Sequence, residues 1–149
     1  MIPNPPEIDA LSTLPVRLFA VRGAILLPGN TPQSIQDSTL ALMQALIDAN
    51  QITPQACVTV WFGLTSDITA ENPARAFRNG VLRGSHLNLS SAWQDVALFC
   101  LQEPSIDGFP ELCLRVLIQY YQAPEHTPTP AYCNGAQERL RPDRLPPAV

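Results

Sequence analysis

Lysine is absent from this chain. All nine basic residues among its 149 are arginine. The absence excludes Schiff-base chemistry and lysine general-base catalysis. Arginine stays charged and presents a fixed fork of donors that suits carboxylates. A positive site on this chain is therefore expected to bind anions rather than to exchange protons.

Charged residues of both signs are scarce. They make up 15% of the chain, against about 25% in an average protein, while 46% of residues are hydrophobic. The net charge is −4 and the sequence contains no cluster of basic residues, which argues against nucleic acid as a partner. So few charges predict that part of the surface is buried against copies of the same chain.

Segments that direct a chain to or across a membrane are not evident either. The N-terminal residues have no basic region and no apolar core, so no signal peptide is expected. No apolar run is long enough to span a bilayer. Cys57, Cys100, Cys113 and Cys133 show no CxxC spacing, so no metal site is expected. They are predicted to be reduced thiols in a cytoplasmic protein.

The apolar pattern predicts an α/β or α+β domain with a mixed sheet, one long helix and one or two short helices. Thr31 and Pro32 are a good cap and first residue for an amphipathic helix that reaches Asn50. Strands are expected over residues 17–24, 57–64, 95–102 and 112–121, the second of them buried on both faces.

The remaining segments are assigned from their composition. Residues 73–78 are predicted to form a short helix and the polar stretch 80–91 a loop. A short edge strand is expected at Tyr132, followed by an irregular tail. One domain over residues 16–143 is predicted, between a proline-rich extension (1–15) and a tail (144–149). The extension is expected to be either ordered by contacts or disordered.

Three charged residues stand beside apolar, strand-like runs: Arg22, Glu103 and Arg115. A buried charge without a partner costs several kcal/mol or more. The three side chains therefore form either a buried ion-pair network or, if the strands converge, a pocket for a small anion that also offers a hydroxyl. The histidines are less informative, because His86 and His126 fall in predicted loops and are expected at the surface.

Five short segments occur in a fixed order along the chain. They are Val21-Arg22-Gly23-Ala24, Thr65 to Thr69 with Pro73 to Ala76, Cys100 to Glu103, Cys113 to Val116, and Leu140 to Asp143. Over residues 16–143 they resemble the monofunctional chorismate mutases of the trimeric Bacillus type. The resemblance implies a homotrimeric pseudo-α/β barrel with active sites between subunits. It also implies a Claisen rearrangement of chorismate to prephenate, for phenylalanine and tyrosine biosynthesis, without metal, cofactor or covalent intermediate.

The same resemblance implies a role for each matching residue. Arg115 would face the breaking ether oxygen, Glu103 would accept the hydrogen bond of the substrate hydroxyl, and Arg22 would grip a carboxylate. Further substrate contacts are implied for the backbone of Phe99, Cys100, Leu101 and Gln102, for Tyr132, for Ala74, Arg75 and Arg78 of a neighbouring subunit, and for Arg141 in a closing C-terminal segment.

The chain departs from the family pattern in a few places. Asn72 stands where an aromatic residue is common, Arg75 replaces a frequent lysine, and residues 80–91 look like an insertion. Ile25 and Leu26 replace small hydroxylated residues. A pericyclic rearrangement needs orientation and charge stabilisation rather than a nucleophile. The absence of an evident catalytic histidine or cysteine therefore agrees with the proposed chemistry.

Two other classes of protein remain open. One is a RidA-like imine deaminase on a similar trimer, which also holds a carboxylate with an arginine. Its usual arginine-containing segment near the C-terminal end is not evident here. The other is a catalytically silent trimer that binds a metabolite. Retention of Arg22, Glu103 and Arg115 together favours the mutase, because a silent protein has no need of three costly charges.

Overall fold

A five-stranded mixed sheet is the centre of the computed structural model, which describes residues 15–84 and 89–144. The strand order is β3-β2-β4-β1-β5. β4 is antiparallel to both β1 and β2, whereas β5 and β3 add in parallel at the two edges. The predicted mixed sheet and fold class are confirmed. The strands are β1 (Arg17–Leu26), β2 (Cys57–Leu64), β3 (Ala97–Gln102), β4 (Cys113–Gln122) and β5 (Ala131–Cys133).

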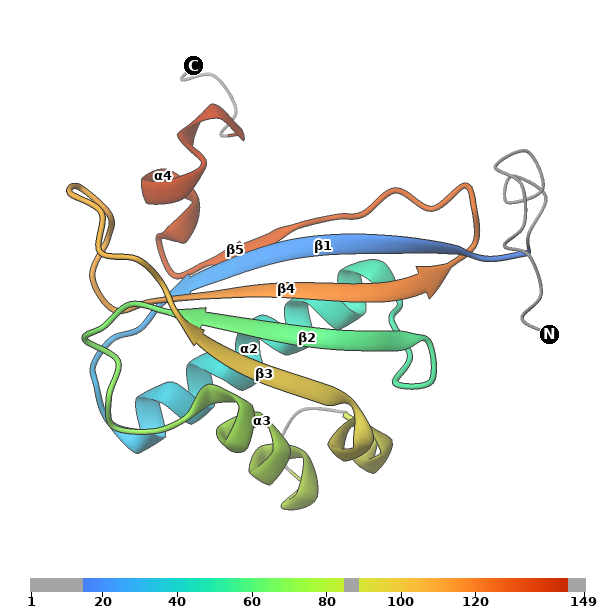
Figure 1. Ribbon diagram of the computed structural model, residues 1–149, viewed down its shortest axis with the longest axis horizontal. Coiled ribbons are helices and arrows are strands. Elements are labelled where there is room, and N and C mark those ends of the chain that lie inside the picture. Colours follow the sequence, from blue (N-terminus) through green and yellow to red (C-terminus); the bar gives the residue numbers. More distant parts are fainter. Residues whose placement is uncertain (1–14, 85–88, 145–149) are drawn as a thin grey trace, which may run out of the picture.

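Two helices, α2 (Pro32–Asn50) and α3 (Pro73–Leu82), cover one face of this sheet (Figure 1). α2 begins as the sequence predicts, because the Thr31 hydroxyl accepts a hydrogen bond from the backbone N–H of Ser34 at 3.1 Å. Its apolar stripe packs on the sheet, with Leu42, Met43 and Leu46 fully buried. The core therefore lies between the two helices and one face of the strands.

The segment from residue 80 to 91 is only in part the loop that the sequence predicts, because both of its ends are helical. α3 continues through Gly80 to Leu82, and a 3-10 helix, η1 (Ser91–Asp95), begins at the other end. Gly80 lies so close to α2 that a Cβ there would be 2.7 Å from a Leu40 methyl. The close helix contact needs glycine and outweighs its poor helix propensity. His86 and the middle of this segment lie outside the described residues.

The C-terminal region is also more regular than predicted. A short helix, α4 (Ala136–Leu140), follows β5, and a 3-10 turn, η2 (Pro142–Arg144), follows α4. Gly135 begins the helix at φ 85°, a conformation that favours glycine, and Ala136 is fully buried. α4 contacts β1 and β5 and lies on the other side of the sheet from α2 and α3 (Figure 1). The predicted extension and tail lie almost entirely outside the described residues.

The second face of the sheet is open in the single chain. Along β2, Val60 and Phe62 are fully buried under the helices, but Trp61 between them is 37% exposed. The prediction that this strand is buried on both faces is therefore wrong for one protomer, because nothing in the described part of the chain buries Trp61 on the second face. The open face carries large apolar side chains, namely Leu18, Trp61, Phe99, Leu101 and Tyr121.

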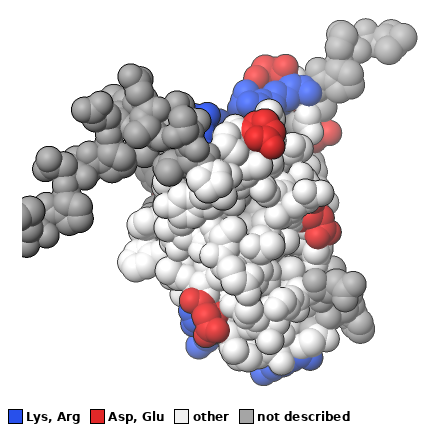
Figure 2. All heavy atoms as spheres, turned by 90° about the vertical axis from the view of Figure 1, so that its right-hand side faces the viewer, with Lys and Arg blue, Asp and Glu red and all other residues white. Residues whose placement is uncertain are grey.

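The side of the molecule drawn in Figure 2 has few charged residues, and those in view lie towards its edges. Within the two described ranges, no helix is both long enough and apolar enough to cross a membrane. His126, predicted at the surface, is instead half-buried. Its Nε2 lies 2.7 Å from the Tyr120 hydroxyl, and its ring stands edge-on to Phe19. The proline-rich connector thus packs onto the sheet.

Candidate active site

The register of the sheet aligns several predicted site residues on its open face. Arg115 of β4 lies opposite Ala24 of β1 on one side and Gly63 of β2 on the other. Ala24 in turn lies opposite Tyr132 of β5. Directly paired residues share one face of a sheet. Since Ala24 and Gly63 are small, they leave room beside the Arg115 side chain, and on the Gly63 side the Glu103 carboxylate fills it.

A two-pronged ion pair joins Arg115 to Glu103 just beyond the end of β3. Arg115 Nε donates to one carboxylate oxygen and Nη2 to the other, both at 2.7 Å. The Glu103 side chain is only 15% exposed, whereas that of Arg115 is 45% exposed. The hydrogen bonds that Arg115 donates to Glu103 raise the pKa of Arg115 above its ordinary value. Glu103 thus binds the Nε–Nη2 edge of the guanidinium. The edge on the other side, which we call the outer edge, faces solvent.

Two neighbours fix this pair in place. The backbone N–H of Glu103 donates to the Leu64 carbonyl at 2.8 Å, which extends the β2–β3 pairing by one residue. A Cβ on Gly63 would lie 2.5 Å from a Glu103 carboxylate oxygen, so only glycine leaves room for that carboxylate. The Arg115 guanidinium carbon also lies 5.3 Å from the centre of the Phe109 ring. The pair is therefore held rigidly before any ligand arrives.

An open cavity of about 780 Å³ lies above the pair. Besides Arg115 and Glu103, several predicted site residues line it: Arg22, Leu101, Gln102, Tyr132 and Arg141. Arg22 and Arg115 are exposed, so of the two alternatives that the sequence left open, the buried ion-pair network is not what the protomer forms. Strand alternation places both on the open face while their neighbours enter the core. The trio is a cavity lining rather than a buried network.

Arg141 borders the cavity where α4 ends. Its Nε and Nη2 donate to the two carboxylate oxygens of Asp143 at 2.9 and 2.7 Å. The hydrogen bonds that Arg141 donates to Asp143 raise the pKa of Arg141, and the nearby Tyr132 contributes in the same direction. The loop after β3 and α4 lie at the same end of the sheet (Figure 1). Both the loop and the helix contribute residues to the cavity.

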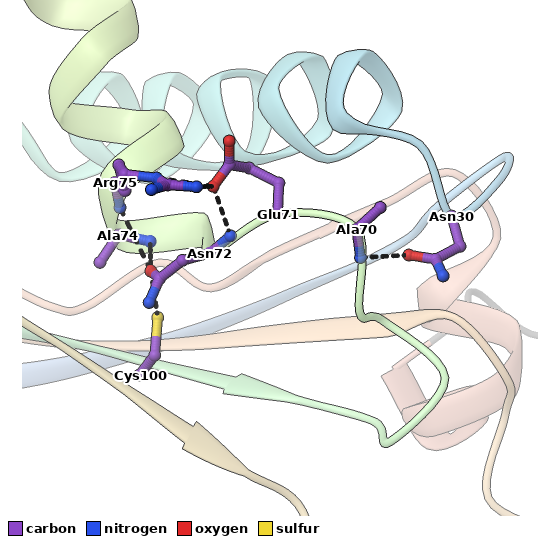
Figure 3. A network of polar contacts seen from close by, with 7 residues as sticks. All are labelled: Asn30, Ala70, Glu71, Asn72, Ala74, Arg75 and Cys100. Atoms are coloured by element: carbon purple, nitrogen blue, oxygen red, sulfur yellow. Dashed lines mark hydrogen bonds and ion pairs between the residues drawn. The ribbon is translucent and has the colours of Figure 1, made fainter.

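The remaining predicted residues form a second cluster, away from this cavity, where α3 begins beside β3. Asn72 caps α3, since its Oδ1 accepts from the backbone N–H groups of Ala74 at 2.9 Å and Arg75 at 3.2 Å. The Cys100 thiol donates to the same oxygen at 3.1 Å, and Arg75 pairs with Glu71 (Figure 3). Burial raises the pKa of the Cys100 thiol, so the thiol stays protonated.

Two predicted residues complete the description of this second cluster. Arg78 is exposed on the next turn of α3, and Phe99 is exposed on the neighbouring strand. The Phe99 ring packs against Trp61, with the ring centres 5.5 Å apart. One protomer thus separates predicted site residues at the cavity from others at α3. We call Arg22, Glu103, Arg115 and Tyr132 the cavity cluster. The α3 cluster consists of Ala74, Arg75, Arg78 and Cys100 together with the cap residue Asn72, which the sequence did not predict as a site residue.

Some residues around the cavity escaped the sequence analysis. Gly63 could have been noticed, because glycine inside a strand often marks a close approach of another group. Phe109 and Arg139 line the cavity from a loop and from α4, and no periodic pattern distinguishes them. Asp67 is outside the cavity cluster and organises the turn after β2. Its carboxylate accepts from the backbone N–H of Leu112 at 2.9 Å.

An α+β fold whose open sheet face holds a guanidinium–carboxylate pair under a cavity defines an enzyme of small anionic metabolites. The chain matches the family model for chorismate mutase type I over residues 18–144, and it belongs to that family. Membership makes it an isomerase of aromatic amino acid biosynthesis, a chorismate mutase. The comparisons give no support to a RidA-like deaminase or to a silent trimer.

Two relatives illustrate the match. Chorismate mutase AroH of Bacillus subtilis (strain 168) is 30% identical over 98 residues, which cover 66% of this chain and 69% of the relative. The solved structure of the chorismate mutase from Clostridium thermocellum is 27% identical. It superposes with a TM-score of 0.65 and covers 80% of this chain and 98% of its own.

Proposed function

We propose that this chain rearranges chorismate to prephenate at the cavity cluster, in a cleft that a second copy of the chain completes. The observation that carries the proposal is the Arg115–Glu103 pair, which leaves the outer edge of a fixed guanidinium facing an open cavity. In this reaction the ether C–O bond breaks while a C–C bond forms within the same molecule. No proton or electron enters or leaves.

Arg115 is the residue that we assign to the breaking bond. Negative charge develops on the ether oxygen, and a donor already in position stabilises it without reorganisation. Glu103 occupies only one edge of the guanidinium, so further N–H groups remain for the substrate. Such a donor contributes about 3 to 4 kcal/mol to transition-state stabilisation. Because arginine does not deprotonate near neutral pH, this contribution is present throughout the physiological range.

The other residues of the cavity hold the substrate in its reactive shape. Glu103 keeps free lone pairs with which to accept a hydrogen bond from the substrate hydroxyl. Arg22, on the strand next to that of Arg115, is assigned to bind a substrate carboxylate. Tyr132 is assigned to contact the substrate from β5. Arg141 reaches the cavity too and, like Arg115, pairs with a carboxylate through Nε and Nη2 only, so its remaining N–H groups are available to the substrate. Orientation of this kind supplies several kcal/mol.

The assembly that we propose is a homotrimer in the cytoplasm. Two features support the assembly: the open sheet face presents large apolar side chains, and the α3 cluster lies outside the cavity of its own protomer. A neighbouring copy would cover the apolar face and bring its Ala74, Arg75 and Arg78 to the mouth of the cleft. Four free thiols suit a reducing compartment.

The direct test is a chorismate-depletion assay on the purified protein, combined with light scattering. We expect saturable loss of chorismate, formation of prephenate, and the mass of a trimer at micromolar concentration. A folded trimer that leaves chorismate unchanged would contradict the proposed reaction. A monodisperse monomer with full activity would instead contradict the shared cleft.

A further inference from the structure

The charges around the cavity are not equally available to a ligand. Four arginines line it, Arg22, Arg115, Arg139 and Arg141, against the carboxylates of Glu103 and Asp107. Arg115 is engaged by Glu103 on one edge, and Arg141 is engaged by Asp143 on one edge. Within residues 15–84 and 89–144, Arg22 and Arg139 make no ion pair. The cavity therefore presents two uncompensated guanidinium groups.

The two groups come from different sides of the cavity. Arg22 projects from β1 on the open face of the sheet. Arg139 is exposed in the last turn of α4, which contacts β1 and β5. Gln137, on the same helix, donates to the Arg144 carbonyl at 3.2 Å, and the Arg141–Asp143 pair closes the turn between them. These contacts fold the end of the chain into a compact unit that carries Arg139 at the cavity wall.

We infer that Arg139 binds one of the two carboxylates of the substrate dianion, while Arg22 binds the other. A dianion needs two cations, and these two are available without breaking an existing ion pair. The main role of the Arg141–Asp143 pair is then to position Arg139, because the pair stabilises the turn that follows this residue. The inference rests on the proposed function and adds a binding residue that the motif comparison with the family does not assign.

The test uses the product, since prephenate is also a dianion and its binding does not depend on turnover. Calorimetric titration of the full-length Arg139→Gln protein with prephenate should give a Kd raised by about tenfold or more, the scale of one lost charged hydrogen bond. The KM for chorismate should rise in parallel, with kcat changed less than threefold. Arg139→Lys should retain part of the affinity through its charge.

Arg144→Gln is the matched control, because it removes one positive charge from the same segment but does not line the cavity. It should bind prephenate like the unmodified protein. Circular dichroism and light scattering verify folding and assembly of each variant. If Arg139→Gln binds prephenate as tightly as Arg144→Gln, the inference is overturned. An unmodified protein that binds prephenate but fails to convert chorismate would contradict the proposed reaction and leave the role of Arg139 to be read from Kd alone.

Discussion

The cavity cluster and the α3 cluster differ in what their contacts hold fixed. In the cavity cluster, strand register and a two-pronged ion pair fix the charged groups themselves. In the α3 cluster, Asn72 and Cys100 fix the backbone at the helix start, whereas the Arg75 side chain is 65% exposed despite its pair with Glu71. We therefore propose that the cavity cluster orients the reacting atoms and that the α3 cluster attracts the anionic substrate.

Loss of the fixed guanidinium should have the largest effect. Arg115→Ala is expected to lower kcat by at least ~100-fold, because it removes the donor at the ether oxygen. Arg115→Lys should remain severely impaired, since it keeps the charge but loses the fork. Steady-state kinetics on protein shown to be folded measures both. A kcat within threefold of the unmodified enzyme for Arg115→Ala would refute the assignment.

Gly63→Ala should have the next largest effect, although glycine and alanine differ by one methyl group. The added Cβ would displace the Glu103 carboxylate, which is held by Arg115 and cannot turn away without breaking the pair. We expect kcat to fall by about tenfold, in keeping with the sensitivity of catalysis to small misplacements. Gly29→Ala is the control, since its Cβ meets nothing closer than 3.9 Å. Equal kinetics for the two variants would show that Glu103 is not positioned as described.

A substitution in the α3 cluster should have a smaller effect, and the effect should be on substrate binding rather than on kcat. Arg78→Gln is expected to raise the KM for chorismate several-fold with little change in kcat, because an exposed charge contributes modestly to binding. The KM should also become less sensitive to salt. Arg83→Gln, beyond the end of the same helix, should leave KM unchanged. A fall in kcat at constant KM for Arg78→Gln would mean that both clusters act on the reacting atoms.

The sequence predicted the residues of the cavity cluster but not how exposed their side chains are. Arg22, Glu103 and Arg115 stand out because charges are rare beside apolar runs, and the sheet does bring them to one cavity. The same runs left a buried ion-pair network open as an alternative. Alternation along a strand decides against it, since Val21 and Val116 enter the core while Arg22 and Arg115 point to the open face.

Tertiary contacts explain what the sequence could not predict. Gly80 lowers the local helix propensity, yet the contact of α3 with Leu40 of α2 requires it. Arg139 belongs to a short helix that is defined by Gly135 and the buried Ala136 rather than by a periodic pattern. The place of Arg75 and Arg78 in a site depends on a second copy of the chain, which no local pattern describes.

The central claim is that the two clusters act together across a subunit boundary, and mixed trimers test it most directly. Arg115→Ala protomers and Arg75→Ala/Arg78→Ala protomers, each with its own tag, are co-expressed and purified over both tags. A cyclic trimer that contains both variants always has one intact site, so about one third of the unmodified activity should return at low chorismate concentration. Mixed trimers no more active than the mean of the two separate variants would contradict the shared site.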